Sequence, residues 1–429
     1  MSTIAYRCPG CGAPLAYGAD SGKLECSACG SRYELDALEA ILESQDAGGI
    51  QFDLPQESFN EEEAAQMRSY ICQSCGAELM TEETTTATAC PYCGSPTVLP
   101  ERIDAGVKPE LVIPFTVSKE QAQKLFEEYF KGKKLLPNVF LNTRNRIAEM
   151  RMLYVPYWLF DCTAGGSAIY DAQKRHIRRE GDWEVTYTEH FVVSRAGQMD
   201  FDSIPVDGSV KLRNEITESL EPYDLSAAVP FEPAVLAGAM ADHADAQAQE
   251  CLSRATERVE KSMEQALRST VAGYTSVTAR HKNFHAQEGK VTPVLMPVWL
   301  ITTEKEGTTY TFAINGQTGK LTCDVPMDGK KAFAWGGGVF AGVAGIAMLI
   351  LWLMEQLASG TILMACIAAL IAALIVVGAL RGQLKQAVHQ SAAANYVVDN
   401  SFDLALRYDR FLYETTKRRK IERNDEKKG

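Results

Sequence analysis

The placement of the cysteines constrains this chain more than any other feature. Eight of the twelve cysteines form four C-x-x-C pairs before residue 94, and the spacing C-x2-C-x14-C-x2-C occurs twice, at an offset of 64 residues. A glycine follows every pair, and a tyrosine stands two positions before the first cysteine of each set, which indicates an internal duplication. The paired residues are Cys8, Cys11, Cys26, Cys29, Cys72, Cys75, Cys90 and Cys93.

Each set of four cysteines has the composition of a structural zinc site. Soft thiolates suit Zn²⁺ at tetrahedral sites, and four protein ligands leave no open position for catalysis. Apolar residues are few in both segments, so metal binding worth about 10–16 kcal/mol has to supply much of the folding free energy. We therefore expect two zinc ribbons, at residues 1–35 and 70–100, each holding one structural Zn²⁺ ion. Redox dithiols and an iron–sulfur centre are alternative uses of such pairs.

The first ribbon is expected to contain a strand hairpin, with residues 15–17 opposite residues 24–25, because fourteen residues can bring one cysteine pair opposite the other. Between the ribbons lies the segment 36–69, which carries nine acids and no lysine or arginine in residues 36–66. This composition predicts a flexible acidic linker. A docking peptide at residues 52–55 is the alternative.

The charge pattern bears on what the ribbons bind. The formal net charge of -12 argues against a general affinity of this chain for nucleic acid. Residues 70–100 contain three glutamates and no lysine or arginine. Because phosphate binding depends on clustered cations, nucleic-acid binding by this ribbon is not expected.

Two uncharged segments, residues 333–354 and 361–380, are each long enough to cross a bilayer. About 20 apolar residues match a hydrocarbon core about 30 Å thick, so we expect a transmembrane helical hairpin at residues 333–380. Lys330 and Lys331 precede the first segment, and Arg381 follows the second. The positive-inside rule then places both ends of the hairpin in the cytosol, in agreement with reduced, metal-binding cysteines.

The intervening residues 105–330 carry a weaker internal repeat. A Pro-x-Trp-Leu segment occurs at residues 156–159 and again at 297–300. Helical patterns at 119–129 and 239–268 precede the two segments, and alternating strand patterns follow them, which predicts a duplicated α+β cytosolic domain.

Candidate catalytic residues are scarce in this middle domain. His281 and His285 have the spacing of helical metal ligands but lack the glutamate of a zincin motif, and solvated or packed histidines are the simpler interpretation. A nucleophile elbow, a phosphate loop and a dinucleotide fingerprint are all missing from the sequence. We therefore expect that the protein is not an enzyme and binds no cofactor besides zinc.

After the hairpin, residues 381–429 form a tail that we expect to be helical and then amphipathic. Residues 417–429 hold seven cations and three acids. Because the tail is tethered to a membrane, anionic lipid headgroups are the nearest polyanion for this basic end. A solubilising end is the alternative. The predicted fold class is thus multidomain, with two small zinc ribbons, a duplicated α+β middle domain and a two-helix transmembrane hairpin.

The order of these parts resembles the bacterial YdjG-like membrane proteins with TFIIB-type zinc ribbons. The four cysteine pairs and residues 299–319, with the Asn-Gly-Gln-Thr-Gly turn at 315–319, carry the resemblance. It implies a multi-pass scaffold or adaptor at the bacterial inner membrane, with both termini in the cytosol and zinc at the eight paired cysteines. It also implies a PspA-like or SPFH (flotillin-like) protein partner, in envelope stress or membrane organisation. A membrane-tethered nucleic-acid-binding protein, related to transcription or replication, is the competing hypothesis.

Overall fold

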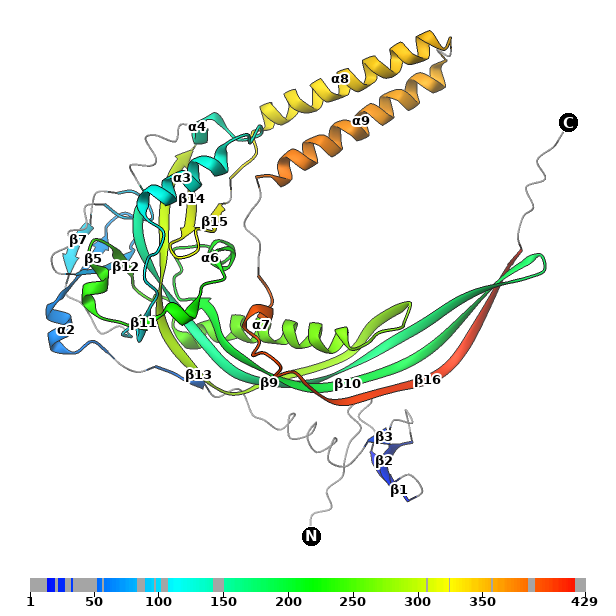
Figure 1. Ribbon diagram of the computed structural model, residues 1–429, viewed down its shortest axis with the longest axis horizontal. Coiled ribbons are helices and arrows are strands. Elements are labelled where there is room, and N and C mark those ends of the chain that lie inside the picture. Colours follow the sequence, from blue (N-terminus) through cyan, green and yellow to red (C-terminus); the bar gives the residue numbers. More distant parts are fainter. Residues whose placement is uncertain are drawn as a thin grey trace.

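The computed structural model shows a long curved sheet, a small separate sheet and a projecting pair of helices (Figure 1). It describes residues 14–19, 22–27, 32–33, 52–55, 58–82, 89–95, 98–101, 107–141, 150–305, 308–323, 325–355, 358–384 and 390–420. Within these residues the fold is a multidomain α+β arrangement.

Four long strands form the curved sheet. They are β9 (Arg151–Glu180), β10 (Trp183–Asp207), β13 (Ser276–Lys305) and β16 (Asp403–Lys420). β9 pairs antiparallel with both β10 and β13, and β16 pairs antiparallel with the other edge of β10. Gly181, the first residue of the two-residue turn between β9 and β10, has a φ of 62°, which suits the hairpin turns that match strand twist.

Short strands extend this sheet to 13 strands and form the separate three-stranded sheet β1-β2-β3. β5, β6 and β7, which come from the second cysteine segment, belong to the large sheet. The short strands are β1 (Leu15–Gly18), β2 (Lys23–Cys26), β3 (Arg32–Tyr33), β4 (Phe52–Asp53), β5 (Met67–Cys72), β6 (Glu78–Glu82), β7 (Val98–Glu101), β8 (Leu111–Val112), β11 (Val229–Pro230), β12 (Met240–Asp242), β14 (Thr308–Asn315) and β15 (Leu321–Cys323).

Helices cover parts of the sheet. α7 (Ala248–Ser269) lies on its concave side (Figure 1). Cys251, Ala255 and Val259 repeat at four-residue spacing along α7, and this buried stripe packs against β9. The other helices are α2 (Glu61–Ala65), α3 (Lys119–Phe130), α4 (Asn138–Leu141) and α6 (Asn214–Leu220), with 3₁₀ turns η1 (Leu225–Ala227), η2 (Pro233–Leu236) and η3 (Ala394–Tyr396).

The expected apolar hairpin is present as two helices. α8 (Gly329–Leu353) and α9 (Ser359–Gly382) have mean hydropathies of 2.0 and 2.9 in their most apolar windows, which are 0% and 11% buried. Both helices are long and apolar enough to cross a membrane. They project from the body at the end where α3 and α4 lie (Figure 1).

After α9 the chain packs against the body again, around a buried ion pair. This pair joins Arg258 of α7 to Glu221, which directly follows α6. The Arg258 guanidinium donates to both carboxylate oxygens of Glu221, at 2.9 and 2.6 Å. The Tyr396 hydroxyl donates to the same carboxylate at 2.8 Å, and the Ala393 N–H donates to the Ser262 hydroxyl at 2.7 Å. The segment 393–396, which follows the hairpin, is therefore tied to the core of the body.

The tail, expected to be helical and then amphipathic, contains a strand at residues 403–420. These residues form β16, whose pairing with β10 places Leu406 opposite Ala196 and Lys420 opposite Trp183. Leu404 and Leu406 alternate with more exposed residues, which is the period of a strand. The expected helix at 239–268 is correct only from Ala248, because Met240–Asp242 forms β12 between β9 and β6.

Two further expectations concern the linker and the repeat. Phe52 and Asp53 pair with Gly289 and Lys290 of β13. The centroids of the Phe52 and Phe160 rings are 5.5 Å apart. This segment therefore docks on its own chain. Only glycine fits at 289, since a Cβ there would lie 2.0 Å from a backbone oxygen of Asp161.

The two Pro-x-Trp-Leu segments lie in neighbouring strands, β9 and β13, of one sheet. Duplication of the middle domain stays a prediction.

Candidate metal centre

The four cysteines of the second segment meet in one cluster. The sulfurs of Cys72, Cys75, Cys90 and Cys93 all lie within 4.8 Å of one another. The Cys72–Cys93 and Cys75–Cys90 sulfur pairs are each 3.6 Å apart. Four sulfurs about 2.3 Å from a tetrahedral metal would be separated by about 3.8 Å, so this arrangement fits a single four-thiolate ion.

Backbone turns after each cysteine pair shape the cluster. The Gly76 N–H donates to the Cys72 carbonyl at 2.8 Å, and the Gly94 N–H donates to the Cys90 carbonyl at 3.0 Å. Both glycines have positive φ, 66° and 72°, a conformation that L side chains rarely adopt. The glycine after each of these two pairs therefore allows the tight turn by which the chain leaves the cluster.

The thiols of this cluster differ in acidity. Burial raises the pKa of Cys72, but hydrogen bonds from the backbone of Cys75 and Ser74 outweigh it and lower the pKa to about 7. Burial raises the pKa of Cys90 well above its ordinary value. The thiolate is the form that binds metal, and the lower pKa makes Cys72 easier to deprotonate than Cys75 and Cys90.

The first set of cysteines lies mostly outside the described residues. Cys8, Cys11 and Cys29 fall there, whereas Cys26 ends β2 and is buried. The strand hairpin expected in this segment is confirmed, with Ala16 opposite Glu25 and Tyr17 opposite Leu24. A metal site formed by Cys8, Cys11, Cys26 and Cys29 remains a prediction from the sequence.

The cluster is fixed to the main sheet through Tyr92, which stands between Cys90 and Cys93. Its hydroxyl donates to Oδ2 of Asp242 at 2.5 Å, and the Ser209 hydroxyl donates to the same oxygen at 2.6 Å. Burial raises the pKa of Asp242 to about 7. The sequence did not single out these residues. The polar aromatic ring inside a C-x-x-C pair was a signal for Tyr92, but Asp242 lies 150 residues away and had none.

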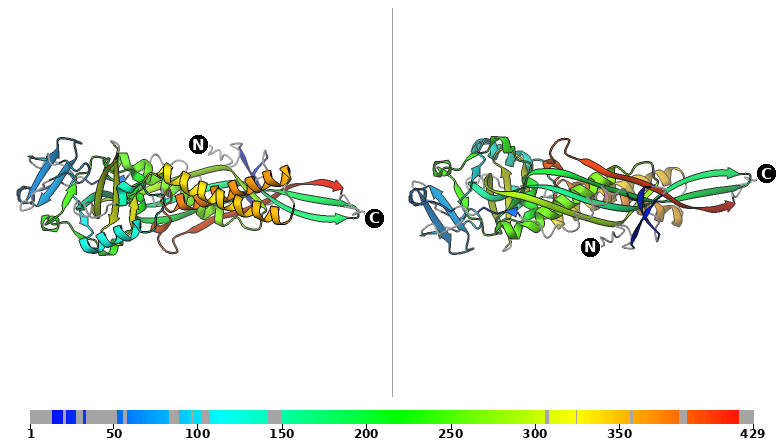
Figure 2. Two further views of the ribbon diagram at one scale, coloured as in Figure 1. Left: turned by 90° about the horizontal axis from the view of Figure 1, so that it is seen from above. Right: turned by 90° about the horizontal axis from the view of Figure 1, so that it is seen from below.

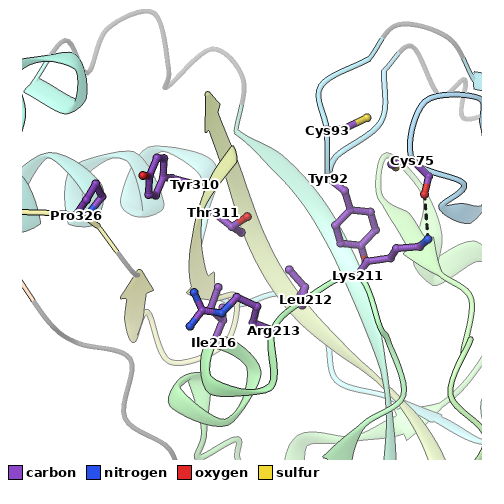
Figure 3. Close-up of a pocket in the computed structure, with 10 residues that line it drawn as sticks. All are labelled: Cys75, Tyr92, Cys93, Lys211, Leu212, Arg213, Ile216, Tyr310, Thr311 and Pro326. Atoms are coloured by element: carbon purple, nitrogen blue, oxygen red, sulfur yellow. Dashed lines mark hydrogen bonds between the residues drawn. The ribbon is translucent and has the colours of Figure 1, made fainter. Parts of the chain in front are cut away.

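A pocket of about 510 Å³ opens beside the cluster (Figure 3). Lys211 donates to the Cys75 carbonyl at 3.0 Å on one wall, and Arg213 adds a second cation at the N-terminus of α6. Two cations next to apolar side chains suit a carboxylate or another anionic group. The lining residues are Cys75, Tyr92, Cys93, Lys211, Leu212, Arg213, Ile216, Tyr310, Thr311 and Pro326.

The histidine pair does not form a second metal site. His281 and His285 lie on β13 rather than on a helix, so the i, i+4 spacing does not give them the shared helical face that metal binding would use. Burial lowers the pKa of His285. Outside the cysteine cluster, the described part of the chain gathers no other group of three or more histidine, cysteine, aspartate or glutamate side chains at metal-binding distance.

Comparison with known proteins finds one relative of nearly full length. No protein-family model and no solved structure matches the chain. The chain is 35% identical over 357 residues to a protein named "Uncharacterized protein YdjG" from Bacillus subtilis (strain 168), and the match covers 83% of this chain and 99% of that protein. At this identity and coverage, the chain belongs to the YdjG family.

Proposed function

We propose that this protein is a membrane-anchored zinc-ribbon adaptor that docks a cytosolic protein partner at the bacterial inner membrane. The pocket between the cysteine cluster and the body is the observation that carries this proposal. Its lining joins Lys211 and Arg213 to the apolar side chains of Leu212 and Ile216. A polar and apolar lining of this kind suits a peptide segment that carries an acidic side chain or a terminal carboxylate.

The anchor of this adaptor is the α8–α9 hairpin. Lys331, in the first turn of α8, donates to the Leu136 carbonyl and the Asn138 side chain of the body, each at 2.6 Å. Arg381 lies in the last turn of α9. By the positive-inside rule, these cations favour a body on the cytosolic side and a two-span topology with both termini in the cytosol.

The metal that we propose for the cluster is Zn²⁺, in a structural role. Four thiolates fill a tetrahedral shell, so no position remains for a substrate or an activated water. The charged lining residues are the cations Lys211 and Arg213, which bind anions and supply no general base at neutral pH. A binding function is therefore favoured over a catalytic one.

The test is partner recruitment by full-length protein with a charge reversal in the pocket. We expect Arg213→Glu to abolish or strongly reduce co-purification and membrane localisation of PspA-like and SPFH-type candidates. The Arg213 side chain is more than half exposed, at 58%, and its ion pair with the exposed Glu215 contributes little to stability, so folding should be retained.

Lys119→Glu is the matched control, because Lys119 is also a cation at the start of a helix, α3, but does not line the pocket. Equal recovery of partners by both variants would reject the pocket as the docking site. Failure of the unmodified protein to recruit any candidate would reject the adaptor function with these partners.

A further inference from the structure

The large sheet continues beyond its helical cover as a narrow arm. We define the arm as residues 174–180 of β9, 183–190 of β10 and 413–420 of β16. β13 begins at Ser276, opposite Gln173 of β9, and α7 ends at Ser269. From that point outward, the described residues show only these three strands, and the arm extends along the long axis of the molecule (Figures 1 and 2).

The strand register concentrates positive charge at the tip of this arm. Val185 lies between Arg178 and Arg418, and Glu184 lies between Arg179 and Arg419. Successive residues of a strand point to opposite faces, so both faces of the tip carry arginines. Between residues 177 and 186 and in residues 417–420, the tip holds six cations and three acids: Arg178, Arg179, Lys417, Arg418, Arg419 and Lys420 against Glu180, Asp182 and Glu184.

Exposed apolar side chains accompany these cations. Trp183, directly after the β9–β10 turn, is 45% exposed and pairs with Lys420 and Glu180. Ile177 is 58% exposed. An interfacial tryptophan among lysines and arginines is typical of segments that lie at the headgroup level of a bilayer.

The arm and the α8–α9 hairpin project from the body toward the same side (Figure 1). When the hairpin lies in a bilayer, the arm is therefore directed at the same bilayer. The arm cannot enter the hydrocarbon, because it carries charges on both faces and an unpaired strand edge. Because the arm extends about as far outward as the free end of the hairpin (Figure 1), the two must tilt apart on a bilayer for the tip to rest at the surface, where phosphate groups of anionic lipids are the complementary charge.

We propose that the tip of the arm binds anionic phospholipid headgroups and forms a second membrane contact, separate from the hairpin. This inference rests on the proposed membrane anchoring and extends it to a lipid class. Arg178, Arg179 and the four cations of residues 417–420 contact phosphates, and Trp183 lies at the interface. Two contacts on one bilayer fix the orientation of the body, and with it the direction in which the pocket beside the cysteine cluster faces.

The test is hydrogen exchange of the full-length protein in large nanodiscs made of phosphatidylcholine alone or mixed with phosphatidylglycerol. We expect peptides that cover residues 174–186 and 413–420 to exchange more slowly in the anionic discs and to lose this protection at high salt. Arg418→Gln/Arg419→Gln/Lys420→Gln should reduce the protection about tenfold or more, since each cation near an anionic surface strengthens binding several-fold. Peptides of α7 report whether the body remains folded.

Lys23→Gln/Arg68→Gln/Lys261→Gln removes the same charge outside the arm and should leave the protection unchanged. Equal exchange in both kinds of disc, or protection that survives the tip substitutions, would overturn the proposal. Protection in neutral discs by added duplex DNA at low salt would overturn it in favour of a nucleic-acid interface. Failure to enter discs of either composition would instead refute the membrane anchoring itself.

Discussion

The two ends of strand β9, its root near Leu153 and its tip from Ile177 to Glu180, differ in the interactions that stabilise them. At its root, Leu153, Val155 and Leu159 enter one core, while Trp158 and Phe160 enter another on the opposite face of the sheet. At its tip, the residues from Ile177 to the turn are exposed on both faces. The root is thus stabilised by burial, whereas the tip is held by strand pairing and a turn. A single strand can thus contribute to a buried core at one end and, at the other, form an exposed surface that the fold does not need for stability.

The largest expected effect concerns the cysteine cluster, which packs against the root. Cys90→Ser removes one of the four cysteines of the candidate metal site, and metal binding at a four-thiolate site of this kind is worth about 10–16 kcal/mol. We expect loss of the bound metal, measured by elemental analysis, and rapid hydrogen exchange in residues 67–101, with the root of β9 still protected. Cys162→Ser is the control, because Cys162 is a buried cysteine of β9 outside the cluster. If the metal-free variant kept its protection, packing rather than metal would fold this segment.

The next largest effect is expected on the free energy of unfolding, when one substitution at the root of β9 is compared with one at its tip. Phe160 is 0% exposed and contacts the Phe52 ring, so Phe160→Ala should lower the free energy of unfolding by about 3–5 kcal/mol. Ile177→Ala at the tip should change it by no more than about 0.5 kcal/mol. Denaturant unfolding of the detergent-solubilised protein, followed by tryptophan fluorescence, measures both. Similar losses for the two variants would show that the tip belongs to the same cooperative core as the root.

Sequence patterns predicted the features of this molecule that depend on residues close together in the chain. The turns after Cys72 and Cys90 follow from cysteine and glycine spacing, and the α8–α9 hairpin follows from two uncharged runs. The basic end at residues 417–429 was found in this way, but its assembly with residues 178–179 was not, because long-range strand pairing through β10 brings residues 178–179 and 418–419 together. The amphipathic part of the tail could not be assigned to a strand from the sequence, because the strand period in β16 is carried by few apolar residues. The partner of β16, β10, lies about half the chain away from it.

We expect the weakest effect on stability from an ion pair that attaches β16 to β10. This pair lies between the buried part of the sheet and its exposed tip. Arg195 of β10 is 1% exposed, and its guanidinium donates to Asp409 of β16 at 2.5 Å and to the Thr270 hydroxyl at 3.1 Å. The Tyr274 hydroxyl donates to the other Asp409 oxygen at 2.9 Å. Burial alone would raise the pKa of Asp409, but these hydrogen bonds outweigh it and hold the pKa below its ordinary value.

A carboxyl whose pKa is lower in the folded state stabilises the fold fully above its unfolded pKa, about 3.9, and this contribution disappears as the pH falls through the folded pKa. Asp409→Asn removes that dependence. The thermal midpoint of the unmodified protein should therefore fall more steeply than that of the variant as the pH falls below about 5. The effect should be small because the Asp409 side chain is 36% exposed and solvent screens the pair. Parallel pH profiles would mean that strand pairing alone, as at the tip, holds β16 to the sheet.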